Sequence, residues 1–265
     1  MTILPATEIQ YQLAERFLSL VIWRPTMKPT ASLALLCLFA TSAFAHFPWL
    51  SADTDGKVTY SFGENPAETN YKLPAPIAKA KVICIGEDGK LSQVELKKVE
   101  TDEFVGMSSV GAVRAKMLMS KVTYGMHAGS RLDYYSFHQT GALPKNRKMY
   151  EQLEKGNSSK QALMPELQVQ LVDTEKGVDA YVVWKGKPLA GADVTLFCEE
   201  GHEEGAATTD EQGKVSFSDK EVEDGLNGIM VGHQVKDDQG EFEGKPYSSS
   251  SHYLTMTFRD PQDFE

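Results

Sequence analysis

The sequence predicts an all-β protein made of two antiparallel β-sandwich domains of the immunoglobulin-like kind, which follow a cleaved signal peptide. Three observations lead to this expectation. Short segments alternate apolar and polar residues with a period of two, turn residues separate these segments at the spacing of a sandwich, and no crossover helix is apparent beyond His46. The chain has 265 residues, which is enough for a signal and two domains of this size.

The N-terminal region has the pattern of an export signal. Lys28 precedes the apolar run Ala31–Ala40, and Ala43-Phe44-Ala45 has the small residues that signal peptidase requires. We therefore assign residues 27–45 to a signal peptide that is cleaved after Ala45, and residues 1–26 to a misassigned start site. The run is shorter than the roughly 20 residues of a membrane span, so we expect a periplasmic or secreted product without a membrane anchor.

The first predicted domain covers residues 46–140. Period-two alternation and flanking turns such as Glu87-Asp88-Gly89 define its strands. These strands are predicted at 57–62, 79–86, 94–99, 113–122 and 132–137. Residues 141–165 change character and are predicted to be a polar linker, because Gly156-Asn-Ser-Ser159 interrupts any helix there.

The second predicted domain covers residues 166–265 and has clearer turns. Lys185-Gly-Lys-Pro188 and Thr209-Asp-Glu-Gln-Gly213 each separate two strand-like segments. Strands are predicted at 167–172, 178–184, 192–198, 214–218, 228–235 and 251–258. Their spacing favours a small immunoglobulin-like sandwich.

Several of these segments carry a resemblance to known families. Gly186–Leu196 and Thr209–Phe217 look like the carboxypeptidase regulatory-like or prealbumin-like sandwich. Together with further motifs, the mature chain resembles the exported bacterial family called domain of unknown function 4198, which is grouped with periplasmic components of nickel and cobalt uptake. The further motifs are His46–Leu50, Tyr124-Gly125, Tyr134-Tyr135, Gly232-His233 and Ser251–Phe258. The resemblance implies two β domains and a transition-metal role.

Charge and cysteine content limit the partners. The net charge of −10 disfavours nucleic acid and anionic membrane surfaces as partners. Cys84 and Cys198 remain after cleavage, each in a strand-like segment. An oxidising compartment would permit a disulfide between them, and two buried free thiols are the alternative.

His46 is the first candidate metal ligand. Cleavage after Ala45 would make it the first residue, and its α-amine and ring Nδ1 could then chelate one ion. Imidazole is also the commonest metal ligand in proteins.

His233 and His252 are the second and third candidates. Each alternates with apolar residues, so both rings are predicted to face the apolar side of their strands. An antiparallel pairing with His233 opposite His252 would bring their Cβ atoms to about 5 Å. Tyr124 is the fourth candidate, with Tyr134 and Tyr135 as alternatives. In the competing interpretation, His233 and His252 are core histidines whose rings bond to the protein itself.

Nitrogen-rich ligation without thiolate favours Cu(II), Ni(II) or Zn(II) over hard ions. The resemblance implies nickel or cobalt, so the expected ion is Ni(II), Co(II) or Cu(II). The leading hypothesis is thus an extracytoplasmic transition-metal-binding protein in nickel, cobalt or copper uptake or handling, with an inner-membrane metal transporter as a possible partner. A non-catalytic interaction module is one alternative, and a copper histidine-brace oxidase is another. No catalytic residue is predicted, because the sequence contains no Walker loop, nucleophile elbow or dinucleotide fingerprint.

Overall fold

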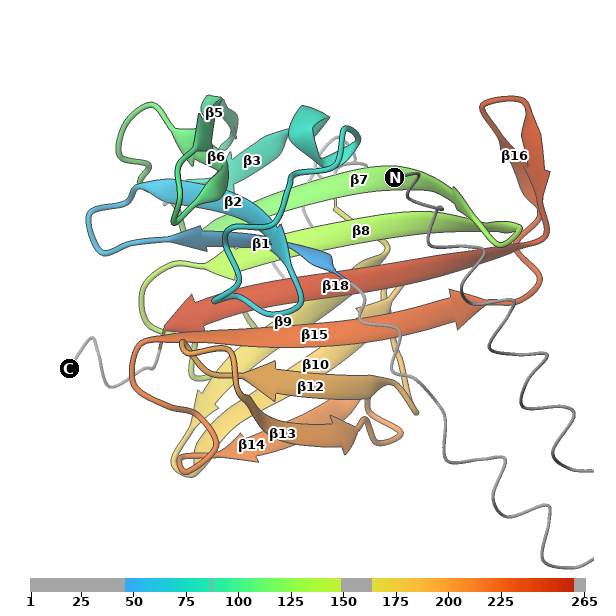
Figure 1. Ribbon diagram of the computed structural model, residues 1–265. Coiled ribbons are helices and arrows are strands. Elements are labelled where there is room, and N and C mark those ends of the chain that lie inside the picture. Colours follow the sequence, from blue (N-terminus) through green and yellow to red (C-terminus); the bar gives the residue numbers. More distant parts are fainter. Residues whose placement is uncertain (1–45, 87, 149–163, 260–265) are drawn as a thin grey trace, which may run out of the picture. The chain divides into compact units, whose positions relative to one another are not determined.

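The computed structural model describes residues 46–86, 88–148 and 164–259 (Figure 1). The predicted misassigned start (1–26) and signal peptide (27–45) lie outside the described residues, as does most of the predicted linker (141–165). Among the described residues, no helix is long and apolar enough to cross a membrane.

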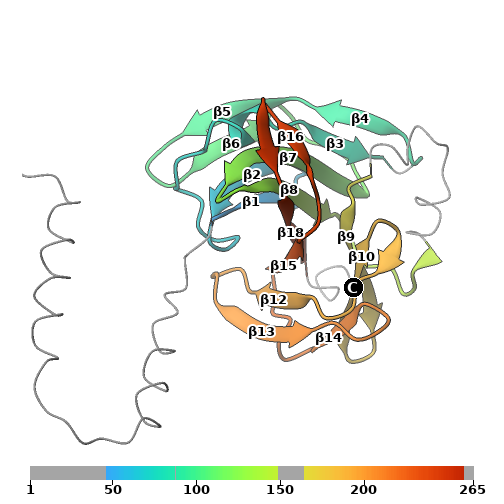
Figure 2. The same cartoon turned by 90° about the vertical axis from the view of Figure 1, so that its right-hand side faces the viewer.

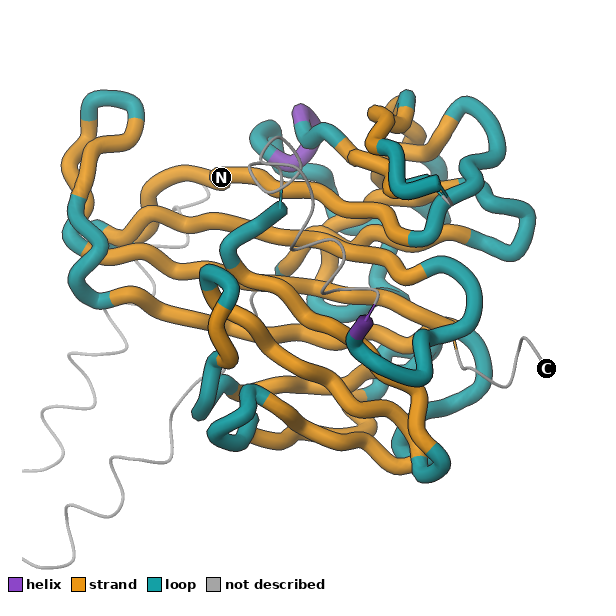
Figure 3. The backbone as a smooth tube through the Cα atoms, turned by 180° about the vertical axis from the view of Figure 1, so that it is seen from behind, coloured by secondary structure: helices purple, strands orange, loops and turns teal. Residues whose placement is uncertain are grey.

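The predicted all-β class with antiparallel sheets is confirmed. Strands account for most of the described chain, as Figure 3 shows, and a short 3-10 helix, η1, spans Ile77–Lys79. The strands form three layers, and the middle layer is an eight-stranded sheet that we call the central sheet. Its order is β13-β12-β15-β18-β8-β7-β3-β4. Its strands are β3 (Val82–Ile85), β4 (Leu91–Val94), β7 (Met117–His127), β8 (Ser130–Gln139), β12 (Asp193–Phe197), β13 (Glu203–Thr208), β15 (Leu226–Val235) and β18 (Ser249–Arg259).

The N-terminal sheet covers one face of the central sheet (Figure 1). Its order is β1-β2-β6-β5, with β1 at Phe47–Ala52, β2 at Val58–Gly63, β5 at Leu96–Glu100 and β6 at Val105–Ser109. Trp49, Leu50 and Tyr60 are among its fully buried side chains, and they pack with Leu118 and Tyr134 of the central sheet. This contact forms the N-terminal core.

The C-terminal sheet covers the opposite face of the central sheet. It consists of β9 (Leu167–Thr174), β10 (Gly177–Trp184), β11 (Lys187–Pro188) and β14 (Lys214–Ser218), with β10 pairing to the other three. Leu171 and Val182 pack there with Leu254, Met256 and Phe258 of β18 to form the C-terminal core. Burying one such apolar side chain stabilises the folded protein by about 1.5–3 kcal/mol relative to leaving that side chain exposed.

A parallel pair joins the two halves of the chain. β18 lies between β15 and β8, and it is antiparallel to β15 but parallel to β8 (Figure 2). Strands from the predicted first domain (46–140) and the predicted second domain (166–265) therefore share one sheet. The described residues from His46 onward lie in a single compact unit with two cores. The predicted boundary separates neither the sheet nor the cores, because Tyr135 joins the C-terminal core and Tyr253 packs against the N-terminal core. Strand pairing depends on register and not on proximity in the sequence.

Most predicted strands are present, with some shifted ends. The segment predicted at 113–122 begins only at Met117 and continues to His127, because β7 stays paired with β8 as far as Ser130. β13 was not predicted, since its acidic start resembled a loop. The hairpin of β16 (Gly240–Phe242) and β17 (Lys245–Tyr247) projects beyond the central sheet where the sequence predicted only a connection (Figure 1).

Alternation along β8 and β18 decides which core each side chain joins. Tyr134 belongs to the N-terminal core, whereas Tyr135 belongs to the C-terminal core. On β18, Tyr253 likewise packs with the N-terminal core and Leu254 with the C-terminal core. Neighbouring residues on these two strands therefore face different sites.

Candidate metal centre

His46 lies immediately before β1, on the N-terminal side of the central sheet. The position is fixed because β1 rests on β8 and β18, where the Ser136 hydroxyl donates a hydrogen bond to the Pro48 carbonyl oxygen at 2.9 Å. The His46 carbonyl oxygen in turn accepts a bond of 3.4 Å from the Tyr134 hydroxyl. The start of β1 is therefore held on the sheet at two successive points.

Aromatic rings orient the imidazole of His46. Its centroid lies 3.9 Å from that of Tyr71 and 5.9 Å from that of Phe62. The side chain is 19% exposed, so the ring is held by its faces and still reaches solvent. Its nitrogens lie in the ring plane, away from the stacked faces.

Two carboxylates from the loop after β2 lie beside this imidazole. One ligand atom each from His46, Glu64 and Glu68 fall within 4.8 Å of one another, and His46 Nε2 is 3.8 Å from a Glu68 oxygen. The loop is shaped by its own hydrogen bonds. The Glu64 N–H donates to Glu68 Oε2 at 2.6 Å, and Asn65 Oδ1 accepts from the N–H groups of Ala67 and Glu68 at 3.0 Å.

The chemistry available here is that of one imidazole and two carboxylates. A carboxylate has about four lone-pair positions, so Glu68 can accept the backbone bond and still offer an electron pair to a cation. Such a nitrogen and oxygen donor set suits divalent transition metals. As a bare ion pair, the same contact would contribute at most about 1 kcal/mol.

Sequence reasoning missed Glu64 and Glu68. The segment Gly63-Glu-Asn-Pro-Ala67 lies between the strands predicted at 57–62 and 79–86, and no ligand was predicted in it. The Asn65-Pro66 pair could have indicated a tight turn there. Such a turn keeps the residues after it close to the end of the preceding strand, and thus keeps Glu68 close to Glu64.

The predicted ligand set of His46, His233 and His252 is not brought together. His233 does lie opposite His252 in the β15–β18 register, as predicted, and their ring centroids are 6.4 Å apart. Both rings, however, contact Trp184 of the C-terminal sheet, with centroid distances of 4.7 and 4.6 Å. They therefore lie on the face of the central sheet opposite to His46.

Tyr124, the fourth predicted ligand, lies on the His46 side. The β7–β8 register shifts between Thr123 and Gly125, so Tyr124 is the extra residue of a β-bulge. Its ring stacks on Phe62 at 6.4 Å and meets the Tyr134 ring edge-on at 5.4 Å. The Phe62 ring thus stacks with both the Tyr124 ring and the His46 ring.

His252 is already saturated with hydrogen bonds. Its Nε2 is 2.7 Å from Ser250 Oγ, and its Nδ1 is 2.9 Å from the Tyr135 hydroxyl, which donates to Glu166 at 3.1 Å. One neutral tautomer satisfies this chain, with Nδ1 donating to Tyr135 and Nε2 accepting from Ser250. The geometry thus favours the interpretation of His252 as a core histidine.

Burial keeps the His252 ring neutral. It lowers the pKa of His252 to about 4, although the Asp133 carboxylate, 3.7 Å from Nδ1, acts in the opposite direction. Burial also lowers the pKa of His233. The order Ser250–His252–Asp133 resembles a nucleophile, base and acid, but Ser250 is 0% exposed, so no substrate can reach it.

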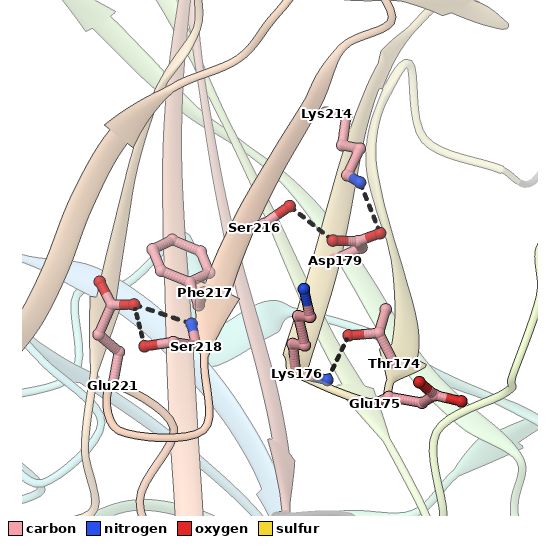
Figure 4. Close-up of a pocket in the computed structure, with 9 residues that line it drawn as sticks. All are labelled: Thr174, Glu175, Lys176, Asp179, Lys214, Ser216, Phe217, Ser218 and Glu221. Atoms are coloured by element: carbon pink, nitrogen blue, oxygen red, sulfur yellow. Dashed lines mark hydrogen bonds and ion pairs between the residues drawn. The ribbon is translucent and has the colours of Figure 1, made fainter.

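A surface depression on the C-terminal sheet is another concave feature (Figure 4). It encloses about 550 Å³, and charged side chains around it bond to one another. Lys214 pairs with Asp179 at 2.8 Å, and Glu221 accepts two bonds from Ser218. These cross-strand and turn contacts explain the polar lining without a ligand.

Comparisons with known proteins identify no family. No family model matches the chain, and no curated protein matches it. Among solved structures, the chain is similar to a biofilm-associated protein BSP domain, with 12% identity, a TM-score of 0.20 and coverage of 81% of this chain and 29% of that one. A Salmonella alpha-2-macroglobulin mutant matches with 9% identity, a TM-score of 0.17 and coverage of 81% and 14%. The chain thus spans less than a third of either structure.

Proposed function

We propose that this protein binds a divalent transition metal in the cell envelope through His46, Glu64 and Glu68, and serves in nickel, cobalt or copper uptake or handling. The observation that supports this most directly is the approach of three ligand atoms from these residues to within 4.8 Å of one another. The proposal replaces the predicted partners of His46 but keeps His46 itself as the principal ligand.

Processing after Ala45 would strengthen such a site. The α-amine of His46 would add a second nitrogen and would form a chelate with ring Nδ1. The imidazole would have to rotate about its Cβ–Cγ bond for this, because Nε2 is the ring nitrogen that lies 3.8 Å from Glu68. The ion would then have up to four donors from three residues. This set matches the preference of Ni(II) and Cu(II) for nitrogen with some oxygen.

The two alternative functions fit less well. A copper histidine brace needs a second imidazole beside the terminal histidine, and the His46 group contains two carboxylates instead. A purely structural interaction module would not require His46, Glu64 and Glu68 to lie close together.

The test is calorimetric titration of the exported, processed protein with Ni(II) and Cu(II), after mass spectrometry has identified its first residue. We expect His46→Ala to weaken binding by at least tenfold, because losing an outer-shell partner alone costs about 10- to 100-fold. Glu64→Gln and Glu68→Gln should weaken it less. A variant with one residue added before His46 isolates the amine, since both carboxylates and the ring remain.

Two matched controls accompany these variants. His127→Ala removes an exposed histidine at the end of β7, and Glu175→Gln neutralises an exposed glutamate of the β9–β10 turn. Both should bind as the parent does. Unchanged affinity in a folded His46→Ala protein would refute the proposal.

A further inference from the structure

A second group of ligand atoms lies in the turn between β12 and β13. The chain reverses tightly there, because the Cys198 N–H donates to the His202 carbonyl oxygen and the Gly201 N–H donates to the Cys198 carbonyl oxygen, each at 3.0 Å. Gly201 has a φ of +85°, a left-handed conformation that glycine adopts without strain. The turn thus returns His202 to the vicinity of Cys198.

A β-bulge brings in a third side chain. Leu196 pairs with Gly205, but Phe197 pairs with Glu203, so Glu204 is the extra residue of the bulge. Bulges of this kind re-aim side chains and are common beside functional sites. The Cys198 thiol is itself buried. One atom each from Cys198, His202 and Glu204 fall within 4.8 Å of one another.

We propose that Cys198, His202 and Glu204 form a second metal site, which takes a thiophilic ion of the Zn(II) class. A thiolate, an imidazole and a carboxylate are the three ligand types that Zn(II) uses. The site differs from the His46 group in containing sulfur, and soft sulfur ligands select Zn(II) or Cu(I) over harder ions. Three protein ligands leave the fourth tetrahedral position to water.

The geometry needs only a small adjustment. Zinc bonds of 2.0–2.3 Å place tetrahedral nitrogen, oxygen and sulfur ligand atoms about 3.3–3.7 Å apart. The three ligand atoms here lie within 4.8 Å of one another, so each pair needs to approach by at most about 1.5 Å. His202 can provide that movement, since its side chain is 70% exposed. Movement of the exposed His202 side chain would also give an entering ion access to the buried Cys198 sulfur.

The surroundings favour a cation. Glu199, Glu200 and Glu203 flank the ligands in the sequence, and the negative charge of Glu223 acts on the thiol. On binding, the sulfur–hydrogen bond breaks, the sulfur electron pair goes to the metal, and the proton passes to solvent. The ion thus takes the place of the thiol proton.

The experiment uses Co(II) as a spectroscopic probe in the His46→Ala background, where the first site is absent. We expect a near-ultraviolet thiolate-to-Co(II) charge-transfer band that Zn(II) displaces. Cys198→Ser should abolish the band, and His202→Ala should weaken Co(II) binding by at least about tenfold. Because His202 is exposed, its variant should fold normally even if Cys198→Ser does not.

Matched controls are Cys84→Ser, which removes the other buried free thiol, and His127→Ala, which removes another exposed histidine. Both should keep the band and the affinity. Absence of the band, its loss in Cys84→Ser, or unchanged binding in His202→Ala would overturn the proposal. A band that persists in His46→Ala separates this site from the function proposed above.

Discussion

His46 and His252 lie on opposite faces of the central sheet and show how differently one residue type can be used. His46 is held by aromatic contacts with its ring faces and has two carboxylates at its edge. His252 has both ring nitrogens in short hydrogen bonds and is 3% exposed. An imidazole can bind a metal only through an unprotonated nitrogen whose lone pair does not already accept a hydrogen bond. Packing by the ring faces preserves that capacity, whereas a saturated network removes it.

The largest effect that separates the two histidines concerns stability. His252→Ala should lower the free energy of unfolding by about 2–5 kcal/mol, because it opens a cavity and leaves the buried Ser250 and Tyr135 hydroxyls without their partner. His46→Ala should change it by less than about 1 kcal/mol. Urea unfolding monitored by fluorescence measures both. Equal losses would contradict the distinction between the faces.

A pH series sharpens the comparison. Burial lowers the pKa of His252 to about 4 and that of His138 to about 3, so both take up protons more readily when the chain is unfolded. Their contribution to stability is therefore present above about pH 6.5 and is lost as the pH falls toward these folded-state values. The loss from His252 is on the order of 3 kcal/mol.

Unfolding free energies between pH 7 and pH 4 give the measurement. His252→Gln and His138→Gln should each reduce the slope of the unfolding free energy against pH, and the double variant should reduce it more than either single variant. A slope that neither variant alters would show that other groups control the acid response.

The smallest expected effect tests the packing around His46. Tyr71 is 43% exposed although its ring lies against His46. Tyr71→Leu should cost less than about 1 kcal/mol of stability and weaken Ni(II) binding by a few-fold, because the imidazole loses its orientation. Val110→Ala, at the other large exposed apolar side chain, is the control and should leave binding unchanged. Unaltered affinity in Tyr71→Leu would show that the stack does not position the ligand.

Local patterns were sufficient for much of the fold. Alternation in Ser251–Phe258 predicted a strand with His252 on its apolar face, and both are confirmed. The register with His233 opposite His252 was considered as the arrangement that would bring the two rings together, and the structure has this register. Periodicity could not predict the parallel pairing of β18 with β8, since that contact joins residues more than a hundred positions apart. β13 was missed because its charged, exposed residues match an edge strand as well as a loop.

The candidate site was less accessible to sequence reasoning. His46 was identified from the cleavage pattern, but its grouping with Glu64 and Glu68 depends on the path of a loop. That path is set by hydrogen bonds between side chains and backbone within the loop, which have no periodic signature. The sequence likewise did not indicate that Tyr71 contacts His46, because apolar and polar residues do not alternate around Tyr71.

The position of β18 also constrains the order in which the chain can assemble. This strand is the last in the described chain, yet it joins β8 and its neighbours to β15 and its neighbours. Until it arrives, the central sheet consists of two fragments with open edges and partly uncovered cores. Contacts of such long sequence separation slow folding and leave aggregation-prone edges exposed in the meantime. A chain that crosses a membrane from its N-terminus would thus complete this sheet only when nearly all of it had emerged.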